Sequence, residues 1–157
     1  MDKRSCSIRD AKAIEERIIH ECRKTKTKWV DQEFPPSNTS IFKRQSALGV
    51  DSWKRLTEMG HSTSVFVDGV GSGDIVQGEL GDCWFLGAAS VVATRNDLLY
   101  PLFVSAHPEY GFFQIKLYKN GQWRVVSIDD FVPMKWNVPR FGRCSDPSEI
   151  WVPLLEK

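Results

Sequence analysis

The amino-acid sequence predicts an α+β domain that is mainly helical and carries one small β-hairpin. Apolar residues recur at helical spacing in residues 8–28 and 82–94, but alternate with polar residues on both sides of the Asn120-Gly121 pair. At 157 residues, of which 41% are hydrophobic, the chain can bury roughly 70% of its unfolded surface. We therefore expect one globular domain.

Charge and composition exclude several classes of protein. The formal net charge of +1 argues against a nucleic-acid or membrane-surface role driven by bulk electrostatics. No apolar run approaches the roughly 18 residues of a membrane span, and the N-terminus lacks the order of a signal peptide. We expect an intracellular, cytoplasmic protein whose four widely separated cysteines are reduced thiols.

The first element is an amphipathic helix within an N-terminal segment of residues 1–28. Its apolar face carries Ile8, Ala11, Ile14, Ile18, Ile19 and Cys22, with charged residues between them. The next stretch, "WVDQEFPPSNTSIF", contains Pro35 and Pro36, which enforce an extended path. We expect a strap that is anchored by its aromatic and aliphatic side chains.

The middle of the chain predicts a loop followed by a helix. Residues 60–73 are rich in Gly and Ser and predict a loop or a strand-to-loop transition. From about Asp82 to Thr94, apolar residues at helical intervals are joined by small residues that allow close packing, so this helix should be largely buried. Pro101 ends any continuation.

The last two elements are the hairpin and a C-terminal helix. Asn120-Gly121 suits a tight turn between the two alternating runs. In "SDPSEIWVPLLEK", Ser145 or Asp146 precedes Pro147, with Glu149 in what would be the first helical turn.

Cys83 is the residue with the clearest chemical potential. A buried core thiol is the ordinary role of a lone cysteine on an apolar helix. Cys83, however, would lie in the first helical turn, where free N–H groups and the helix dipole favour a thiolate, and Gly78 and Gly81 leave room for a substrate. The Cys83 N–H could also stabilise an oxyanion, and the Gln77 amide could be a second donor or simply a surface side chain.

Four blocks in order give the chain a family resemblance. "QGELGDCWFL" resembles the nucleophile segment of calpain-type cysteine proteases, "WVDQEFPP" a segment near the start of their protease core, "GQWRVVSIDDFVP" their Asp-Asp hairpin and "SEIWVPLLEK" a following helix. The resemblance implies that residues 29–157 are the first, mainly helical lobe of a papain-like core, with the nucleophile helix at its centre.

The resemblance also implies site residues and a cofactor. Cys83 takes the position of the nucleophile, Gln77 that of the oxyanion donor, and Trp84 lies beside the nucleophile in the substrate cleft. Members of this family hold calcium in the same lobe, and the matching positions are backbone carbonyls and carboxylates, hard oxygen ligands that suit Ca²⁺: Val67, Gly69, Asp74 and Glu149.

Two departures from the family pattern limit these expectations. Ser72 stands where the best-known calpains carry an arginine that helps link calcium to the active site, so calcium activation could be altered. A cysteine protease also needs a histidine base, which in this family lies with an asparagine in a second lobe. His20, His61 and His107 are expected to be ordinary surface or core-edge residues.

The expected function is therefore one half of a calcium-dependent cysteine endopeptidase that acts on protein substrates and is inactive without a second lobe carrying His and Asn. We expect a fragment of a longer protease. The alternatives are a non-catalytic module that binds a peptide or partner around Trp84 and Trp151, and a redox sensor at Cys83.

Overall fold

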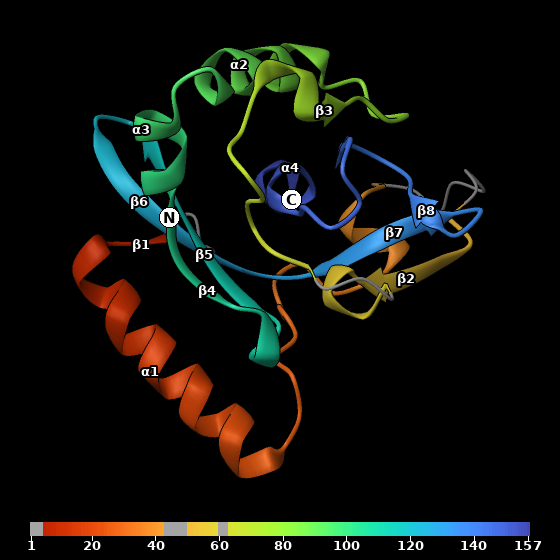
Figure 1. The fold of residues 1–157 in the computed structure, drawn as a ribbon. Coiled ribbons are helices and arrows are strands. Elements are labelled where there is room, and N and C mark those ends of the chain that lie inside the picture. Colours follow the sequence, from red (N-terminus) through yellow and green to blue (C-terminus); the bar gives the residue numbers. More distant parts are fainter. Residues whose placement is uncertain (1–4, 43–49, 60–62) are drawn as a thin grey trace. The chain divides into compact units, whose positions relative to one another are not determined.

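The structure is a computed structural model that describes residues 5–42, 50–59 and 63–157 (Figure 1). The chain forms two compact units, one made of Met1–Pro35 with Pro101–Asp130 and the other of Pro36–Tyr100 with Phe131–Lys157. Part of the predicted loop, residues 60–62 with His61, lies outside the described residues. No described helix has the length and apolar character needed to cross a membrane.

The first unit is a four-stranded antiparallel sheet with one long helix. The sheet has the strand order β1-β6-β5-β4, and helix α1 runs beside it (Figure 1). The bounds are β1 Ser5–Cys6, α1 Ile8–Thr25, β4 Phe103–His107, β5 Phe112–Lys119 and β6 Gln122–Asp129.

The predicted N-terminal helix and hairpin are both confirmed. Ser7 caps α1 by accepting a hydrogen bond from the Asp10 N–H at 3.2 Å. Helix α1 ends at Thr25, slightly earlier than expected, because Lys26 adopts a left-handed conformation with φ of 57°. Strands β5 and β6 pair from Phe112 with Asp129 to Lys119 with Gln122, so that Asn120 and Gly121 form the turn.

The core of this unit explains the helical spacing of the sequence. Ile18 and Cys22 of α1 pack with Phe112 of β5. The rings of Phe112 and Trp29 of the strap pack edge to face, with their centroids 5.3 Å apart. The strap is further held by the Asp31 N–H, which donates a 2.7 Å hydrogen bond to the buried carboxylate of Asp129. The strap is thus anchored by both apolar and polar contacts.

The described part of the second unit has two small antiparallel sheets and three α-helices. In the first sheet, β7 (Phe131–Lys135) pairs with β2 (Ser52–Arg55) on one side and with β8 (Val138–Pro139) on the other. In the second sheet, β3 (Ile75–Val76) pairs with β9 (Arg143–Cys144). The helices are α2 (Cys83–Ala93), α3 (Asn96–Leu99) and α4 (Trp151–Glu156). The described chain therefore contains more strands than the single small hairpin expected from the sequence.

Two sequence predictions about this unit are wrong in detail. Helix α2 forms at the predicted residues but is only half buried: Leu86, Ala89 and Ala93 face the core, whereas Val91 is 69% exposed. The C-terminal helix begins at Trp151, after the predicted start, because the Asp146 carboxylate accepts hydrogen bonds from the N–H and hydroxyl of Ser148 and so forms a local turn.

Candidate active site

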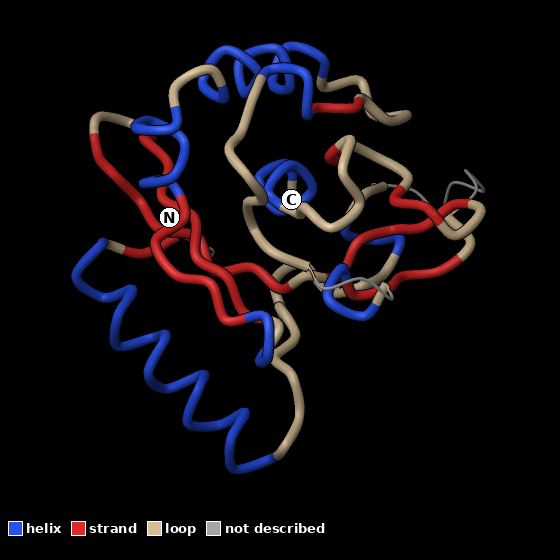
Figure 2. The backbone as a smooth tube through the Cα atoms, viewed as in Figure 1, coloured by secondary structure: helices blue, strands red, loops and turns tan. Residues whose placement is uncertain are grey.

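The two candidate catalytic residues lie at the ends of one short loop. Gln77 follows strand β3 directly and Cys83 is the first residue of α2; both are exposed. Figure 2 traces the connection as a loop with no regular structure. Strand β3 is fixed by pairing with β9, Ile75 opposite Cys144 and Val76 opposite Arg143. The loop therefore leaves a defined strand and enters a defined helix.

The segment Arg140–Gly142 packs against this loop. Gly78 lies so close to the Phe141 backbone that a Cβ atom would overlap it, so only glycine fits there without movement. The Glu79 N–H donates a 3.3 Å hydrogen bond to the Arg140 carbonyl. These contacts hold the loop at Gly78 and Glu79.

Glu79 adds an ion-pair network to the same support. Its carboxylate accepts from Lys135 Nζ at 2.5 Å and from Arg140 Nη2 at 3.1 Å. Burial opposes ionisation of Glu79, but the bond from Lys135, the largest influence, and the bond from Arg140 lower its pKa. The Arg140 side chain is only 6% exposed, so this network ties the loop to an interior cation.

Cys83 differs from the other cysteines in its surroundings. All four are free thiols in the part of the chain that the structure describes, and Cys83 is the exposed one. Burial raises the pKa of the Cys6 thiol and raises that of Cys144 to about 12, while Cys22 is packed in the core. Solvent access makes Cys83 the thiol available for chemistry.

The first turn of α2 leaves hydrogen-bond donors available beside the thiol. The Asp82 carbonyl accepts from the N–H groups of Phe85 and Leu86 at 2.8 and 3.1 Å, which closes the helix start. Among the described residues, neither the Cys83 N–H nor the Gln77 side chain has a hydrogen-bond partner. Both donors can therefore be offered to an oxyanion.

Trp84 and its neighbours form an exposed apolar face on α2. Trp84 is 74% exposed and touches only the edge of Phe85 among the described rings. Ala88 and Val91 lie on the same helical face and are also exposed. Trp151, which the binding-module hypothesis placed beside Trp84, is instead fully buried, so it cannot line a cleft.

Of the predicted calcium residues, Val67 contacts Glu149 directly. Glu149 precedes α4 instead of lying in its first turn, and its Oε1 accepts a 3.0 Å hydrogen bond from the Val67 N–H. The backbone of Ser64 bonds to Ser148 and Ile150 on either side of Glu149. The structure thus joins the loop before β3 to Glu149.

Asp74 and Gly69 are the other two predicted calcium residues. Asp74 Oδ2 accepts a 2.6 Å hydrogen bond from the Gly71 N–H, while Gly69 adopts φ of +92°. Burial raises the pKa of Glu149, and the negative charge of Asp74 raises it further. The negative charge of Asp74 is therefore close enough to disfavour ionisation of Glu149.

The residue types at these four positions are those that a hard cation uses. Two mutually repelling carboxylates gain from a cation between them, and carboxylate and carbonyl oxygens are the ligands that Ca²⁺ prefers. Side chains alone would not coordinate a metal ion here, because the described residues contain no group of three or more His, Cys, Asp or Glu that could hold one. Backbone carbonyls would have to complete the coordination.

The two described histidines have structural surroundings. His20 is exposed on α1, and His107 Nε2 lies 2.6 Å from Glu15 Oε1, with Nδ1 3.4 Å from Glu109. The contact with Glu15 joins β4 to α1, while Glu109 lies in the turn directly after β4, so His107 serves the first unit's own packing.

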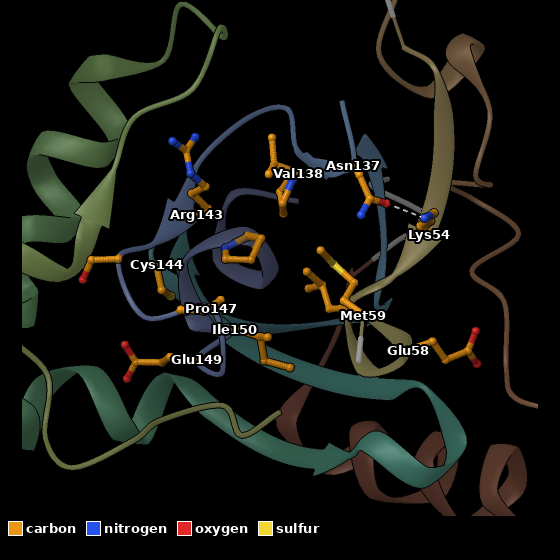
Figure 3. Close-up of a pocket in the computed structure, with 14 residues that line it drawn as sticks. Lys54, Glu58, Met59, Asn137, Val138, Arg143, Cys144, Pro147, Glu149 and Ile150 are labelled. Carbon is orange, nitrogen blue, oxygen red and sulfur yellow. Dashed lines mark hydrogen bonds between the residues drawn. The ribbon is translucent and has the colours of Figure 1, made fainter. Parts of the chain in front are cut away.

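The second unit also contains a pocket of about 570 Å³ (Figure 3). Its lining includes Arg143, Cys144 and Glu149 on one side, and Lys54, which bonds to Asn137, on the other. Of the described residues, neither Gln77 nor Cys83 lines this pocket. It is therefore separate from the candidate nucleophile.

Several residues of this site carry no signal in the sequence. Glu79, Arg140 and Glu156 read as ordinary charged residues, because their partners are 14 to 61 positions away in the chain. The pair Gly78 and Gly81 indicated an open loop, but only the structure distinguishes the glycine that contacts Phe141 from the one with open space around it.

Comparison with known proteins gives a consistent family. The model of the calpain family of cysteine proteases matches residues 29–157. The chain is 35% identical over 150 residues to Calpain-5 of Caenorhabditis elegans, covering 90% of this chain and 23% of that protein. It is 33% identical over 138 residues to Calpain-10 of Mus musculus, covering 81% of this chain and 21% of that protein.

A plant relative extends the match. The calpain-type cysteine protease ADL1 of Oryza sativa subsp. japonica is 30% identical over 158 residues, covering 93% of this chain and 7% of that protein. The chain thus spans about a quarter or less of the length of these relatives. With the family model matched from Trp29 to the last residue, this chain belongs to the calpain family of cysteine proteases.

Proposed function

We propose that this chain supplies the nucleophile of a calcium-dependent cysteine endopeptidase that cleaves protein substrates. The observation that carries the proposal is the exposed Cys83 thiol at the first residue of α2, beside unoccupied N–H donors and behind a loop held by the Arg140–Gly142 segment. The N-terminus of a helix is a position where free N–H groups and the helix dipole favour a negative charge.

The chemistry follows from these groups. The Cys83 thiolate attacks the carbonyl carbon of the scissile peptide, and the carbonyl π electrons move to its oxygen. The Gln77 amide and the Cys83 N–H donate hydrogen bonds to that oxyanion. A histidine then protonates the leaving amine, and water later hydrolyses the thioester.

The histidine belongs to a second lobe in this proposal. Residues 29–157 would form the first lobe of a papain-like core, preceded by the helical segment of residues 1–28, and a lobe with His and Asn would face Cys83. Two observations support it: His107 is engaged by Glu15 and Glu109, and the apolar face of α2 around Trp84 and Val91 is exposed.

Calcium would be held by the Asp74 and Glu149 carboxylates with the Val67 and Gly69 carbonyls. The bond from Val67 to Glu149 and the effect of Asp74 on the Glu149 pKa support this assignment. When bound, the ion would offset the charge of the two carboxylates and so stiffen the loop that leads through β3 to Gln77. Ser72 lies in the same loop and could change how strongly calcium acts.

The experiment joins this chain to a calpain-family lobe that carries the His and Asn. We expect calcium-dependent turnover of a fluorogenic peptide, abolished in Cys83→Ala and strongly reduced in Gln77→Ala, since losing one oxyanion donor costs about 100- to 1,000-fold in kcat. If the joined protein instead binds the peptide but cleaves nothing, and Cys83→Ala binds it equally well, the non-catalytic module would be favoured.

A further inference from the structure

Directly before the nucleophile, the Asp82 side chain does not perform the usual role of an aspartate at a helix start. It is the N-cap residue of α2, yet its carboxylate accepts no hydrogen bond from the first turn of the helix. Its Oδ1 atom is buried and has no hydrogen-bond partner among the described residues. An aspartate at this position ordinarily caps the N–H of the second or third helical residue, so its position here needs another explanation.

Glu156, near the end of α4, supplies that explanation. Its two carboxylate oxygens accept hydrogen bonds of 3.0 and 2.9 Å from the Gly142 N–H, and the neighbouring Asp82 side chain raises the pKa of Glu156. A Cβ at Gly142 would lie 2.9 Å from Glu156 Oε1, so a larger residue there would displace the Glu156 carboxyl group. The Glu156 carboxyl group thus connects α4, the Gly142 backbone and the residue before Cys83.

A protonated Glu156 carboxyl group can donate a hydrogen bond to the neighbouring Asp82 side chain. Two carboxylates at this distance repel, whereas one proton between them makes one group a donor and leaves a single negative charge. Burial raises the pKa of Glu156 to about 8, and the contact with Asp82 contributes in the same direction. The proton is therefore retained near neutral pH.

The other charged groups around Glu156 do not neutralise it. Strand β9, packed against α4, carries Arg143, which lines the separate pocket (Figure 3), and the buried Cys144. Lys157 follows Glu156 in the chain, and its Nζ donates to the Phe131 carbonyl at 3.1 Å. In the described part of the chain, the Glu156 carboxyl group accepts from the Gly142 N–H and lies beside Asp82.

We propose that Glu156 is a positioning residue for Cys83, acting through a protonated carboxyl pair with Asp82 that fastens the first turn of α2 to α4. Loss of the shared proton places a second negative charge beside the nucleophile and releases this fastening. This role rests on Cys83 being the reacting thiol, but the carboxyl pair itself does not.

The sign of the pH dependence follows from the raised pKa. Between the ordinary carboxyl value of 4.5 and about 8, the folded chain holds a proton that the unfolded chain has lost. Stability from the pair is therefore complete below the ordinary value, falls as pH rises through this window, and is lost above it.

The test compares the 157-residue chain with Glu156→Gln, Glu156→Ala and the control Glu16→Gln, an exposed carboxylate on α1. The Gln side chain reproduces the protonated acid, since it can donate to Asp82 and accept from Gly142. We expect the Tm of the parent to fall by about 4 °C more than that of Glu156→Gln from about pH 5 to about pH 9. Glu16→Gln should follow the parent, and Glu156→Ala should melt lower throughout.

The second readout is the rate of Cys83 alkylation by iodoacetamide, assigned by peptide mass. Glu156→Gln should react about two- to fivefold faster than the parent near pH 9, because it lacks the second negative charge. Coincident pH profiles of Tm for parent and Glu156→Gln would overturn the carboxyl pair. A changed Tm profile with unchanged alkylation would overturn the positioning role and leave the peptidase proposal intact, since neither readout requires turnover.

Discussion

The Val67 N–H donates a 3.0 Å hydrogen bond to Oε1 of Glu149, a residue 82 positions later in the chain. This bond fastens the loop before β3 to the segment before α4, and β3 leads directly into Gln77. A change in the charge of this region can therefore reach the catalytic loop through one short strand. The first prediction concerns the ion that would bind there.

Calcium should raise the Tm of the parent chain through Asp74 and Glu149. At a free calcium concentration about 100-fold above Kd, the expected stabilisation is about 2.7 kcal/mol, or roughly 5–10 °C in Tm. Asp74→Asn should lose most of this rise. Asp68→Asn is the matched control, because Asp68 is an exposed carboxylate in the same loop with φ of 48°, which asparagine tolerates. Equal calcium responses in the two variants would contradict the metal assignment.

Gly78→Ala should destabilise the chain, by about 1–3 kcal/mol, because the added methyl group overlaps the Phe141 backbone and forces it to move. The comparison is Gly81→Ala in the same loop, where the methyl group meets nothing within 4 Å. Urea unfolding of both variants measures the difference. If Gly81→Ala proves the more damaging, the close contact with Phe141 does not hold the loop.

Glu79→Gln should lower the Tm and make Cys83 alkylation faster or slower than in the parent, since the loop loses its ion pairs to Lys135 and Arg140. Asp97→Asn is the control, because the Arg95–Asp97 pair is more than 60% exposed at both ends and such pairs contribute little. Thermal melting at low and high salt measures the contribution of the Glu79 ion pairs. Salt should change the Tm of the parent more than that of Glu79→Gln. A Glu79→Gln variant indistinguishable from Asp97→Asn in both measurements would refute the support by Glu79.

Glu15 should make the first unit sensitive to acid. Burial opposes its ionisation, but hydrogen bonds from His107 and Ser105 outweigh burial and lower the pKa of Glu15. The stability it gives is therefore present above the ordinary carboxyl pKa and is lost as pH falls through the lowered value. Melting curves below about pH 5 should fall less steeply for Glu15→Gln than for Glu16→Gln. Equal slopes would show that this contact does not contribute.

The sequence predicted the elements whose signal is local. Helix α1 follows from the spacing of its apolar residues, and the hairpin turn follows from Asn120-Gly121, both of which depend on residues close in the chain. The half-exposed face of α2 was mispredicted, since an apolar residue such as Val91 is equally compatible with a core and with an exposed face. The late start of α4 depends on how Asp146 bonds to Ser148, a choice that helix-start rules do not decide.

The candidate site divides in the same way. The nucleophile and its loop could be recognised because "QGELGDCW" is a contiguous motif. The contacts of Glu79 with Arg140 and of Asp82 with Glu156 could not be predicted, because each joins residues far apart in the sequence. Charged residues with no repeating pattern give no indication of their partners until the backbone brings them together.

Peptide turnover by this chain alone can be measured with a fluorogenic substrate over a range of calcium concentrations, beside Cys83→Ala. We expect no turnover at any calcium concentration in either protein, because in the proposed function the base that takes the thiol proton comes from a second lobe. Turnover by the parent that disappears in Cys83→Ala would contradict the claim that this chain carries only the nucleophile half of the catalytic site.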